Sequence, residues 1–272
     1  MTDDQKRSKY YLPKNSAQEQ AEAAKLLRWN WSPRALDLLT RYPRRGKEAH
    51  ILTVDEVRKQ NAQLEEPFPE EMIVDFQREL GGFTYSTPGE DGDWATWGLT
   101  NIYAMDKADL EPGEEQTMVC CYYNTARPDS YRLAADGKLW DTVPVAIGAK
   151  LEIERIAYLE EVHKPFTESK KIHILVRDLP SPRLLFLDAC NEVFSALQWK
   201  ADELTRGDYG CIWQGVSGWA RYSYEFENDQ ELFFFGTFLD IDDASSFYWR
   251  VKELAPLQEI TVMGMPTPTR CG

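Results

Sequence analysis

Apolar residues recur along the chain with the spacing of amphipathic helices in some segments and of alternating strands in others. One segment begins at Pro69 and carries apolar residues on one face of a helical period: Met72, Ile73, Phe76 and Leu80. Gly81 and Gly82 follow it, and glycine tolerates the left-handed conformation that ends many helices. The pattern therefore predicts a helix that begins near Pro69 and stops at the two glycines.

Similar patterns predict further helices over residues 17–29, from Pro33 to the basic stretch RYPRRG, and over residues 54–63 and 151–162. Ser16 and Thr53 each precede a glutamate by three residues, which is the spacing of a capping box. Ser32 stands before Pro33 and is expected to cap the second helix. In the helix over 151–162 the acidic residues are expected to form a solvated face: Glu152, Glu154, Glu160 and Glu161.

Between these helices the chain favours strands at residues 83–85, 97–104, 116–123, 130–134 and 138–141. Asp136-Gly137 separates the last two and is a strong hairpin signal, because Gly accepts the positive φ that tight turns require. Cys120 and Cys121 lie within one predicted strand, so alternation would point one thiol inward and the other outward.

The last hundred residues show a separate pattern of predicted strands and helices. A strand at 172–176 precedes a helix at 182–204, strands at 220–227 and 231–239, a helix capped by Asp242, and a strand at 259–263. The order strand–helix–strand–strand–helix–strand is that of the split βαβ, ferredoxin-like (βαββαβ-like) arrangement. The sequence therefore predicts an α+β protein with an N-terminal helical segment (1–48), a central α+β domain (49–165) and a C-terminal α+β domain (171–272).

Composition and charge limit the classes of partner that we expect for this protein. With 43% hydrophobic residues the 272-residue chain can bury a core, and it has no apolar run long enough to cross a membrane. Its first residues lack an apolar stretch, so we expect no secretory signal. The formal net charge is −14; residues 1–48 hold eleven Lys and Arg against six Asp and Glu, which leaves −19 for the rest. An acidic body repels nucleic acid and attracts basic protein partners. We expect a cytoplasmic protein without nucleic-acid or membrane partners, although plain solubility would also explain the charge.

Signatures of catalysis are missing from the sequence. The five cysteines form no C-x-x-C pair, the three histidines stand apart from them, and no G-x-S-x-G, P-loop or G-x-G-x-x-G occurs. Asp240, Asp242 and Asp243 imitate part of a divalent-metal site but lack the remaining ligands of an EF-hand loop. The sequence therefore predicts neither an enzyme nor a cofactor or metal.

Two aromatic features are candidates for partner binding. The first is a loop in which aromatic side chains stand among carboxylates, a plausible hot spot for a basic partner: Glu90, Asp91, Asp93, Trp94 and Trp97. The alternative is that both indoles fold back into the core. The second is an aromatic run whose alternation indicates that both faces of its strand are covered, in the chain itself or by a partner: Phe233, Phe234, Phe235 and Phe238.

The central residues resemble the SUKH superfamily. The resemblance covers roughly residues 50 to 165 and rests on a helix that ends in Gly-Gly-Phe, the stretch IYAMDKADL, the hairpin Tyr131-x-Leu133-x-x-Asp136-Gly137 and a closing helix. Many bacterial members of that superfamily are immunity proteins that bind and neutralise toxin domains of polymorphic toxin systems, and others are regulatory scaffolds. Family interfaces vary, so the resemblance transfers no binding residue.

The resemblance implies an immunity protein whose partner is a cognate toxin domain, and the acidic body implies that this toxin is basic. Two alternatives stay open at this point. The protein could be a regulatory scaffold without a toxin partner, or an enzyme that uses the Asp-rich or the Cys-containing sites. Bound metal, or a cleft in which His173 meets Cys190 or Cys211, would favour the enzyme. The sequence does not fix the oligomeric state or the toxin's chemistry.

Overall fold

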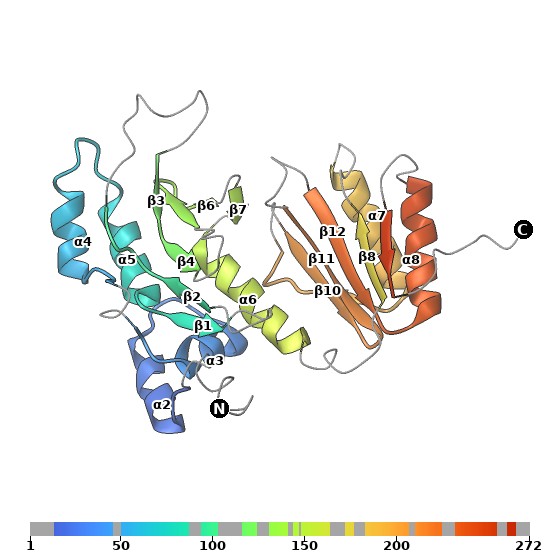
Figure 1. The fold of residues 1–272 in the computed structure, drawn as a ribbon, viewed down its shortest axis with the longest axis horizontal. Helices are drawn as coiled ribbons and strands as arrows, with labels where there is room; N and C mark the ends of the chain where they lie inside the picture. Colours follow the sequence, from blue (N-terminus) through green and yellow to red (C-terminus); the bar gives the residue numbers. More distant parts are fainter. Residues whose placement is uncertain are drawn as a thin grey trace, which may run out of the picture. The chain divides into compact units, whose positions relative to one another are not determined.

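The computed structural model describes residues 14–45, 50–86, 94–102, 116–123, 131–140, 144–146, 148–163, 172–176, 183–206, 210–224, 232–254 and 260–264. These residues form seven helices together with antiparallel sheets, which confirms the α+β class (Figure 1). Within them, no helix combines the length and the apolar character needed to cross a bilayer.

The chain divides into two compact units. Unit 1 comprises Met1–Asp141 and Gly148–Ala157, and unit 2 comprises Thr142–Ile147 and Tyr158–Gly272. The N-terminal helices, for which the sequence predicted a separate segment, are thus grouped with the central region. The division at the other side falls within helix α6 (Ala149–His163) instead of in the linker that follows this helix.

Unit 1 contains four helices before its strands, and α6 after them. The helices are α2 (Ala17–Leu26), α3 (Pro33–Arg41), α4 (Val54–Asn61) and α5 (Glu70–Leu80). The strands are β1 (Thr84–Ser86), β2 (Trp94–Trp97), β3 (Thr117–Val119), β4 (Cys121–Tyr123), β5 (Arg132–Ala134) and β6 (Leu139–Trp140).

The helix starts follow the sequence closely because they depend on local hydrogen bonds. Ser16 and Thr53 form the two predicted capping boxes, and the Ser32 hydroxyl accepts a hydrogen bond from the Ala35 N–H. The hydrogen bonds from Ser16 and Thr53 lower the pKa values of Glu19 and Glu56, with the backbone N–H of each cap as the larger cause. The ionised form of each glutamate is therefore favoured by its capping box.

A β-bulge divides the strand over 117–123 into β3 and β4. The N–H groups of Cys120 and Cys121 both donate to the Tyr131 carbonyl, at 2.8 and 3.3 Å, so two residues oppose one. β3 pairs with β5, whereas β4 pairs with β2. The bulge thus lets one strand serve both the β1–β2–β4 sheet and the sheet that contains β3, β5 and β6.

The strand predicted over residues 97–104 lies earlier, at Trp94–Trp97. It ends because Gly98 has a φ of 136°, which L side chains rarely adopt, and a Cβ there would stand 2.8 Å from Ile51 Cγ2. The predicted hairpin at Asp136-Gly137 is confirmed. Gly137 has a φ of 85°, and the Asp136 carboxylate accepts a hydrogen bond from the Lys138 N–H.

Two buried carboxylates fix the connection between α2 and α3 onto unit 1. Glu79 on α5 accepts hydrogen bonds from the Arg28 N–H at 2.6 Å and from Trp31 Nε1 at 2.9 Å. Glu154 on α6 accepts from the Ser32 N–H at 2.9 Å and from its hydroxyl at 2.5 Å. Their exposed fractions are only 1% and 3%. The expectation that Glu154 belongs to a solvated acidic face is therefore wrong.

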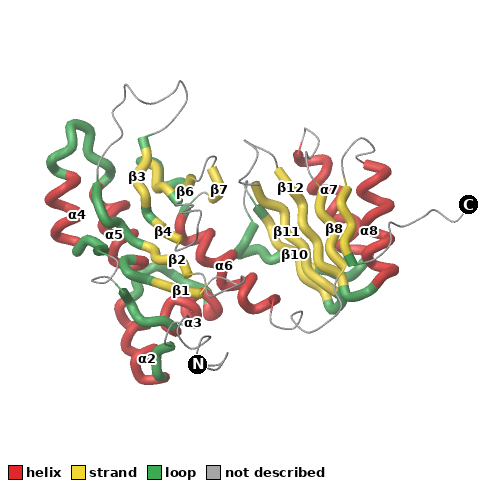
Figure 2. The backbone as a smooth tube through the Cα atoms, viewed as in Figure 1, coloured by secondary structure: helices red, strands yellow, loops and turns green. Residues whose placement is uncertain are grey.

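Unit 2 is built on one antiparallel sheet in the order β13–β8–β12–β11–β10–β9. Figure 2 labels four of these strands: β8, β12, β11 and β10. Its strands are β8 (Ile172–Val176), β9 (Lys200–Ala201), β10 (Cys211–Gly215), β11 (Gly218–Tyr224), β12 (Leu232–Phe238) and β13 (Ile260–Met263). The remaining elements are β7 (Pro144–Ala146) and the helices α7 (Arg183–Ala196) and α8 (Ile241–Leu254). The order strand–helix–strand–strand–helix–strand is present, with β9 and β10 inserted after α7.

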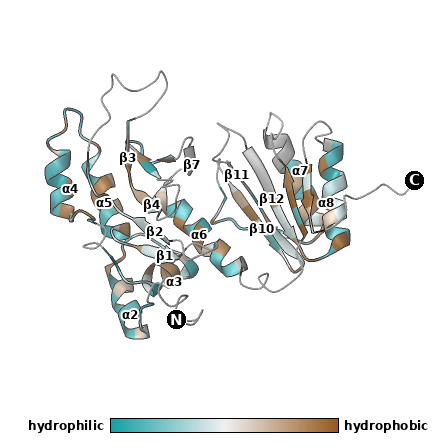
Figure 3. Cartoon of the chain, viewed as in Figure 1, coloured by the Kyte–Doolittle hydropathy of each residue, from teal (hydrophilic) through white to brown (hydrophobic). Residues whose placement is uncertain are grey.

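The core of unit 2 lies between this sheet and the helices α7 and α8. Alternate residues of β8 enter it: Ile172, Ile174 and Val176. Phe194 of α7 stacks on Trp199 and on Phe247 of α8, with ring centroids 4.9 and 5.4 Å apart. In Figure 3 the colouring of β8 is mostly hydrophobic, in agreement with its packing in this core.

The opposite face of the sheet carries a smaller cluster. Tyr158 and Leu159, from the C-terminal part of α6, pack there against Ile212 and Trp219, together with Phe235. Phe238 lies on the helix side and is fully buried, so alternation along β12 covers both faces as predicted for these two residues. The side chains of Phe233 and Phe234 lie outside the described residues.

Trp199 is wedged against the hairpin that joins β10 to β11. A Cβ on Gly215 would lie 2.1 Å from Trp199 Cδ1, and a Cβ on Gly218 would lie 2.2 Å from the Thr237 carbonyl oxygen. Side chains at these two positions would collide with an indole that is itself locked in the core. The two glycines are therefore required by close packing.

We predict that Glu79→Gln and Glu154→Gln each lower the free energy of unfolding by about 1–3 kcal/mol. The amide offers one acceptor oxygen, so one of the two donors loses its partner inside the protein. Urea unfolding measures the change. Glu22→Gln is the control, because Glu22 is exposed in a surface pair with Lys25. Equal stability of all three variants would contradict this account.

We predict that Gly215→Ala costs about 1–3 kcal/mol of stability, because the new methyl group displaces the Trp199 indole. Gly148→Ala is the matched control, since the nearest atom to its Cβ would be the Gly137 oxygen at 3.8 Å, an ordinary contact. Thermal unfolding followed by tryptophan fluorescence measures both. A Gly215→Ala protein as stable as Gly148→Ala would show that the wedge is not tightly packed.

Candidate partner-binding surface

The structure separates the residues predicted to form a hot spot. Trp94 begins β2 and is half-buried, whereas Trp97 ends β2 with an exposed fraction of 0%. Glu90, Asp91 and Asp93 lie outside the described residues. Trp97 is therefore not a partner-binding residue as predicted, because a partner could not reach its indole.

Strand pairing explains the position of Trp97. It lies opposite Cys121 in the β2–β4 pair, and its ring stacks on Tyr131 with centroids 5.4 Å apart. Tyr131 in turn donates its hydroxyl hydrogen to Glu152 of α6 at 3.1 Å. The indole belongs to the layer between sheet and helix, the alternative that the sequence left open.

An acidic surface that sequence reasoning did not single out lies on α4, α5 and the loop between them. We call it the α4–α5 surface. Its exposed carboxylates are Asp55, Glu56, Glu65, Glu66, Glu70 and Glu71. Only three exposed bases accompany these six acids: Arg58, Lys59 and Arg78. Figure 3 shows α4 coloured mostly as hydrophilic. The glutamates of the stretch LEEPFPEE are the sequence feature that could have indicated this acidic surface.

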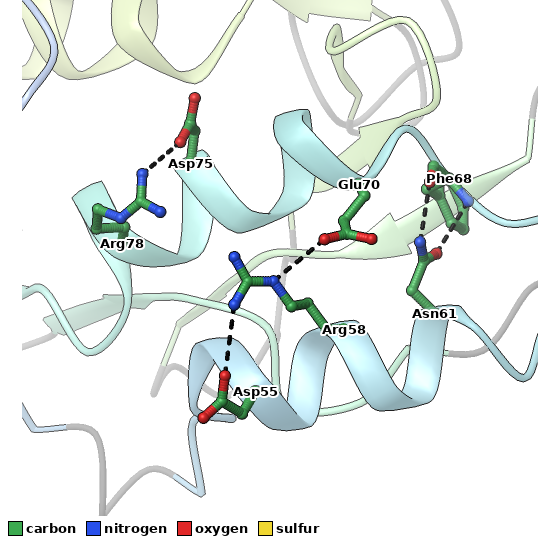
Figure 4. A network of polar contacts seen from close by, with 7 residues as sticks. All are labelled: Asp55, Arg58, Asn61, Phe68, Glu70, Asp75 and Arg78. Carbon is green, nitrogen blue, oxygen red and sulfur yellow. Dashed lines mark hydrogen bonds and ion pairs between the residues drawn. The ribbon is translucent and has the colours of Figure 1, made fainter.

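Asn61 fixes the geometry of this surface (Figure 4). Its side-chain amide donates to the Phe68 carbonyl and accepts from the Phe68 N–H, both at 2.9 Å. Asn61 and Phe68 are both buried, so the double hydrogen bond is shielded from water. The loop that carries Glu65 and Glu66 is thereby held at its base, and α4 and α5 pack as a helical hairpin.

Ion pairs on the α4–α5 surface use the few bases present. Arg58 contacts Asp55 at 3.4 Å and Glu70 at 3.1 Å, and Arg78 contacts Asp75 at 2.6 Å (Figure 4). Solvent-exposed pairs of this kind contribute only about 0–1 kcal/mol each. With six exposed acids against three exposed bases, the surface keeps an excess of carboxylates.

The cysteines do not form a reactive site among the described residues. Cys120 and Cys121 are both fully buried, because the bulge interrupts the alternation that would turn one of them outward. Burial raises the pKa of both thiols and of Cys190 well above their ordinary value. The expectation of one outward thiol is wrong.

The Cys–His site that would indicate an enzyme is not formed by the described residues. Cys190 and Cys211 lie in the core between the sheet of unit 2 and its helices. His173 points to the other face of β8, where its ring stacks on Phe235 and its Nδ1 lies 3.1 Å from the Thr237 hydroxyl. The sheet separates the imidazole from both thiols.

Two of the three aspartates that imitate a metal site have structural roles, those at positions 240 and 243. Asp240, not Asp242 as predicted, caps α8: its Oδ1 accepts from the N–H groups of Asp242 and Asp243 at 2.9 and 3.0 Å. Asp243 accepts a hydrogen bond from Ser217. The described residues contain no group of three or more His, Cys, Asp or Glu side chains that could hold a metal ion.

Comparisons with family models, curated proteins and solved structures give no match for this chain. The resemblance of residues 50 to 165 to the SUKH superfamily therefore stays a prediction.

We predict that Cys120, Cys121, Cys190 and Cys211 resist a water-soluble thiol reagent at pH 8 in the native protein and react after unfolding in guanidinium. The reason is that burial excludes the reagent and, for three of these thiols, raises the pKa of the group that must ionise. Mass spectrometry of labelled peptides identifies the modified positions. Rapid labelling of Cys121 in the native protein would contradict the burial that we attribute to the bulge.

Proposed function

We propose that this protein is a non-enzymatic, cytoplasmic binding protein that neutralises a cognate toxin domain by direct contact, as an immunity protein does. The observation that carries the proposal is the α4–α5 surface, an acidic face on a hairpin held rigid by Asn61 and Phe68. Carboxylates arranged in this way steer a basic partner and set its rate of association. The toxin is accordingly proposed to be basic.

We further propose a SUKH-like fold for the central part of unit 1. Three described features agree with the residues on which the resemblance rests. Helix α5 ends at Gly81, the β5–β6 hairpin turns at Gly137, and α6 follows these strands along the chain. For unit 2 we propose a ferredoxin-like arrangement of β8, α7, β11, β12, α8 and β13, extended by β9 and β10.

A regulatory scaffold is the second candidate, and unit 2 is the observation that favours it. This unit has a hydrophobic core of its own and lies largely outside the SUKH-like region. A scaffold would use it to hold a second protein. Recovery of several cellular proteins, together with no toxin gene beside the gene for this chain, would favour the scaffold.

The test of the immunity proposal is association with the toxin domain encoded beside this chain. We expect a stable complex and loss of toxin activity on mixing, with association that slows as salt is raised because surface charge is screened. No complex at micromolar concentrations in low salt would reject the proposal.

Charge reversal tests whether the α4–α5 surface carries this binding. The triple variant Glu65→Lys, Glu70→Lys and Glu71→Lys should slow association about tenfold or more, since it turns attraction into repulsion. The matched control reverses three exposed acids of unit 2: Asp188, Glu203 and Glu253. Equal slowing in both triples would assign the effect to net charge alone and remove the surface from the proposal.

A further inference from the structure

One end of the unit 2 sheet exposes large apolar side chains. Val216 in the β10–β11 turn is 100% exposed, and Leu239 and Ile241, between β12 and α8, are 37% and 53% exposed. We call these three residues the apolar tip. They are half of the six large hydrophobic side chains that are exposed among the described residues. Scattered exposed apolar residues are common, whereas neighbouring ones mark interaction sites.

Two hydrogen bonds hold the turn beside the segment that enters α8. The Leu239 N–H donates to the Ser217 carbonyl at 2.7 Å, and the Ser217 hydroxyl donates to Asp243. Val216 precedes Ser217, and Ile241 lies between Leu239 and Asp243. The three apolar side chains therefore stand on two loops that are joined to each other.

The support of the apolar tip is rigid. Trp199 packs against Gly215 and Gly218, which flank the turn, and its Nε1 lies 3.2 Å from the Ser217 hydroxyl that it donates to. A surface fixed in advance loses little conformational freedom on binding. Valine at this place has no evident folding role, because turns favour Gly, Pro, Asn, Asp and Ser.

The segments that carry the apolar tip are acidic. Asp240 and Asp242 are exposed next to Ile241, and neither the turn over 215–218 nor the segment 239–243 contains a basic residue. Desolvated apolar contacts give affinity, and carboxylates at their rim favour lysine or arginine on the partner. Anionic membranes would be repelled by the same carboxylates.

We infer that the apolar tip docks a partner protein through an apolar side chain flanked by lysine or arginine. The inference rests on the proposed function in taking the partner to be a basic protein. It adds a contact face on unit 2, apart from the α4–α5 surface, and states what the partner must present there.

The experiment uses the full chain and a synthetic peptide with a central pair of leucines between lysines. Its binding is followed by amide chemical shifts at low salt. We expect shifts at residues 215–218 and 239–243, and about tenfold weaker binding to the double variant Val216→Ser and Ile241→Ser. Both positions are exposed, so the variant should keep the native melting temperature. Leu26→Ser is the control, because Leu26 is 69% exposed on α2.

Four outcomes would overturn the inference: no binding of the peptide to the native chain, shifts centred elsewhere, equal binding by the double variant, or equal binding of a peptide with glutamates in place of the lysines. Binding to zwitterionic vesicles without binding to the peptide would assign the apolar tip to lipid and also overturn it. A toxin complex that survives these results would leave the proposed function standing without this contact face. A failed toxin complex leaves the peptide result unchanged.

Discussion

The burial of two carboxylates constrains much of unit 1. Glu79 on α5 and Glu154 on α6 lie far apart in sequence, yet both point at the few residues between α2 and α3. A carboxyl group buried inside a protein is costly unless hydrogen-bond partners surround it, so these donors must stay in place for the fold to persist. Backbone N–H groups of Arg28 and Ser32 provide part of that shell. Helices α2 and α3, which belong to the basic first 48 residues, are thereby made part of an otherwise acidic chain.

Rigid support under exposed chemistry recurs in both units. In unit 1 the buried pair of Asn61 and Phe68 fixes the loop of the α4–α5 surface, and in unit 2 Trp199 and two glycines fix the turn that bears the apolar tip. Each support is largely buried, and each exposed face carries carboxylates. Such an arrangement suits recognition by shape and charge, because little conformational entropy is lost when a partner binds.

Local patterns in the sequence predicted most helices, the capping boxes and the Asp136-Gly137 turn, since these depend on neighbours within four residues. The helix predicted over 182–204 is too long, because α7 ends at Ala196 and the strand β9 follows at Lys200–Ala201. The features that the sequence did not predict depend on contacts between distant segments. The bulge at Cys120 exists because Tyr131 pairs across the sheet, and Trp97 is buried because that same residue stacks on it. Glu154 belongs to a run of glutamates whose pattern predicts a solvated face. Its different role is visible only in the structure, where the Ser32 N–H donates to it. The acidic set on α4 and α5 becomes one surface only when the hairpin closes.

Native-state hydrogen exchange of the Arg28 and Ser32 amides tests the central claim most directly. Both lie in a connection between helices, where amides usually exchange quickly, and both donate to buried carboxylates. If the carboxylates hold this connection, the two amides will exchange as slowly as the Cys120 amide inside the sheet. Exchange at the rate of an exposed loop would contradict the claim that Glu79 and Glu154 hold the N-terminal helices against the rest of unit 1.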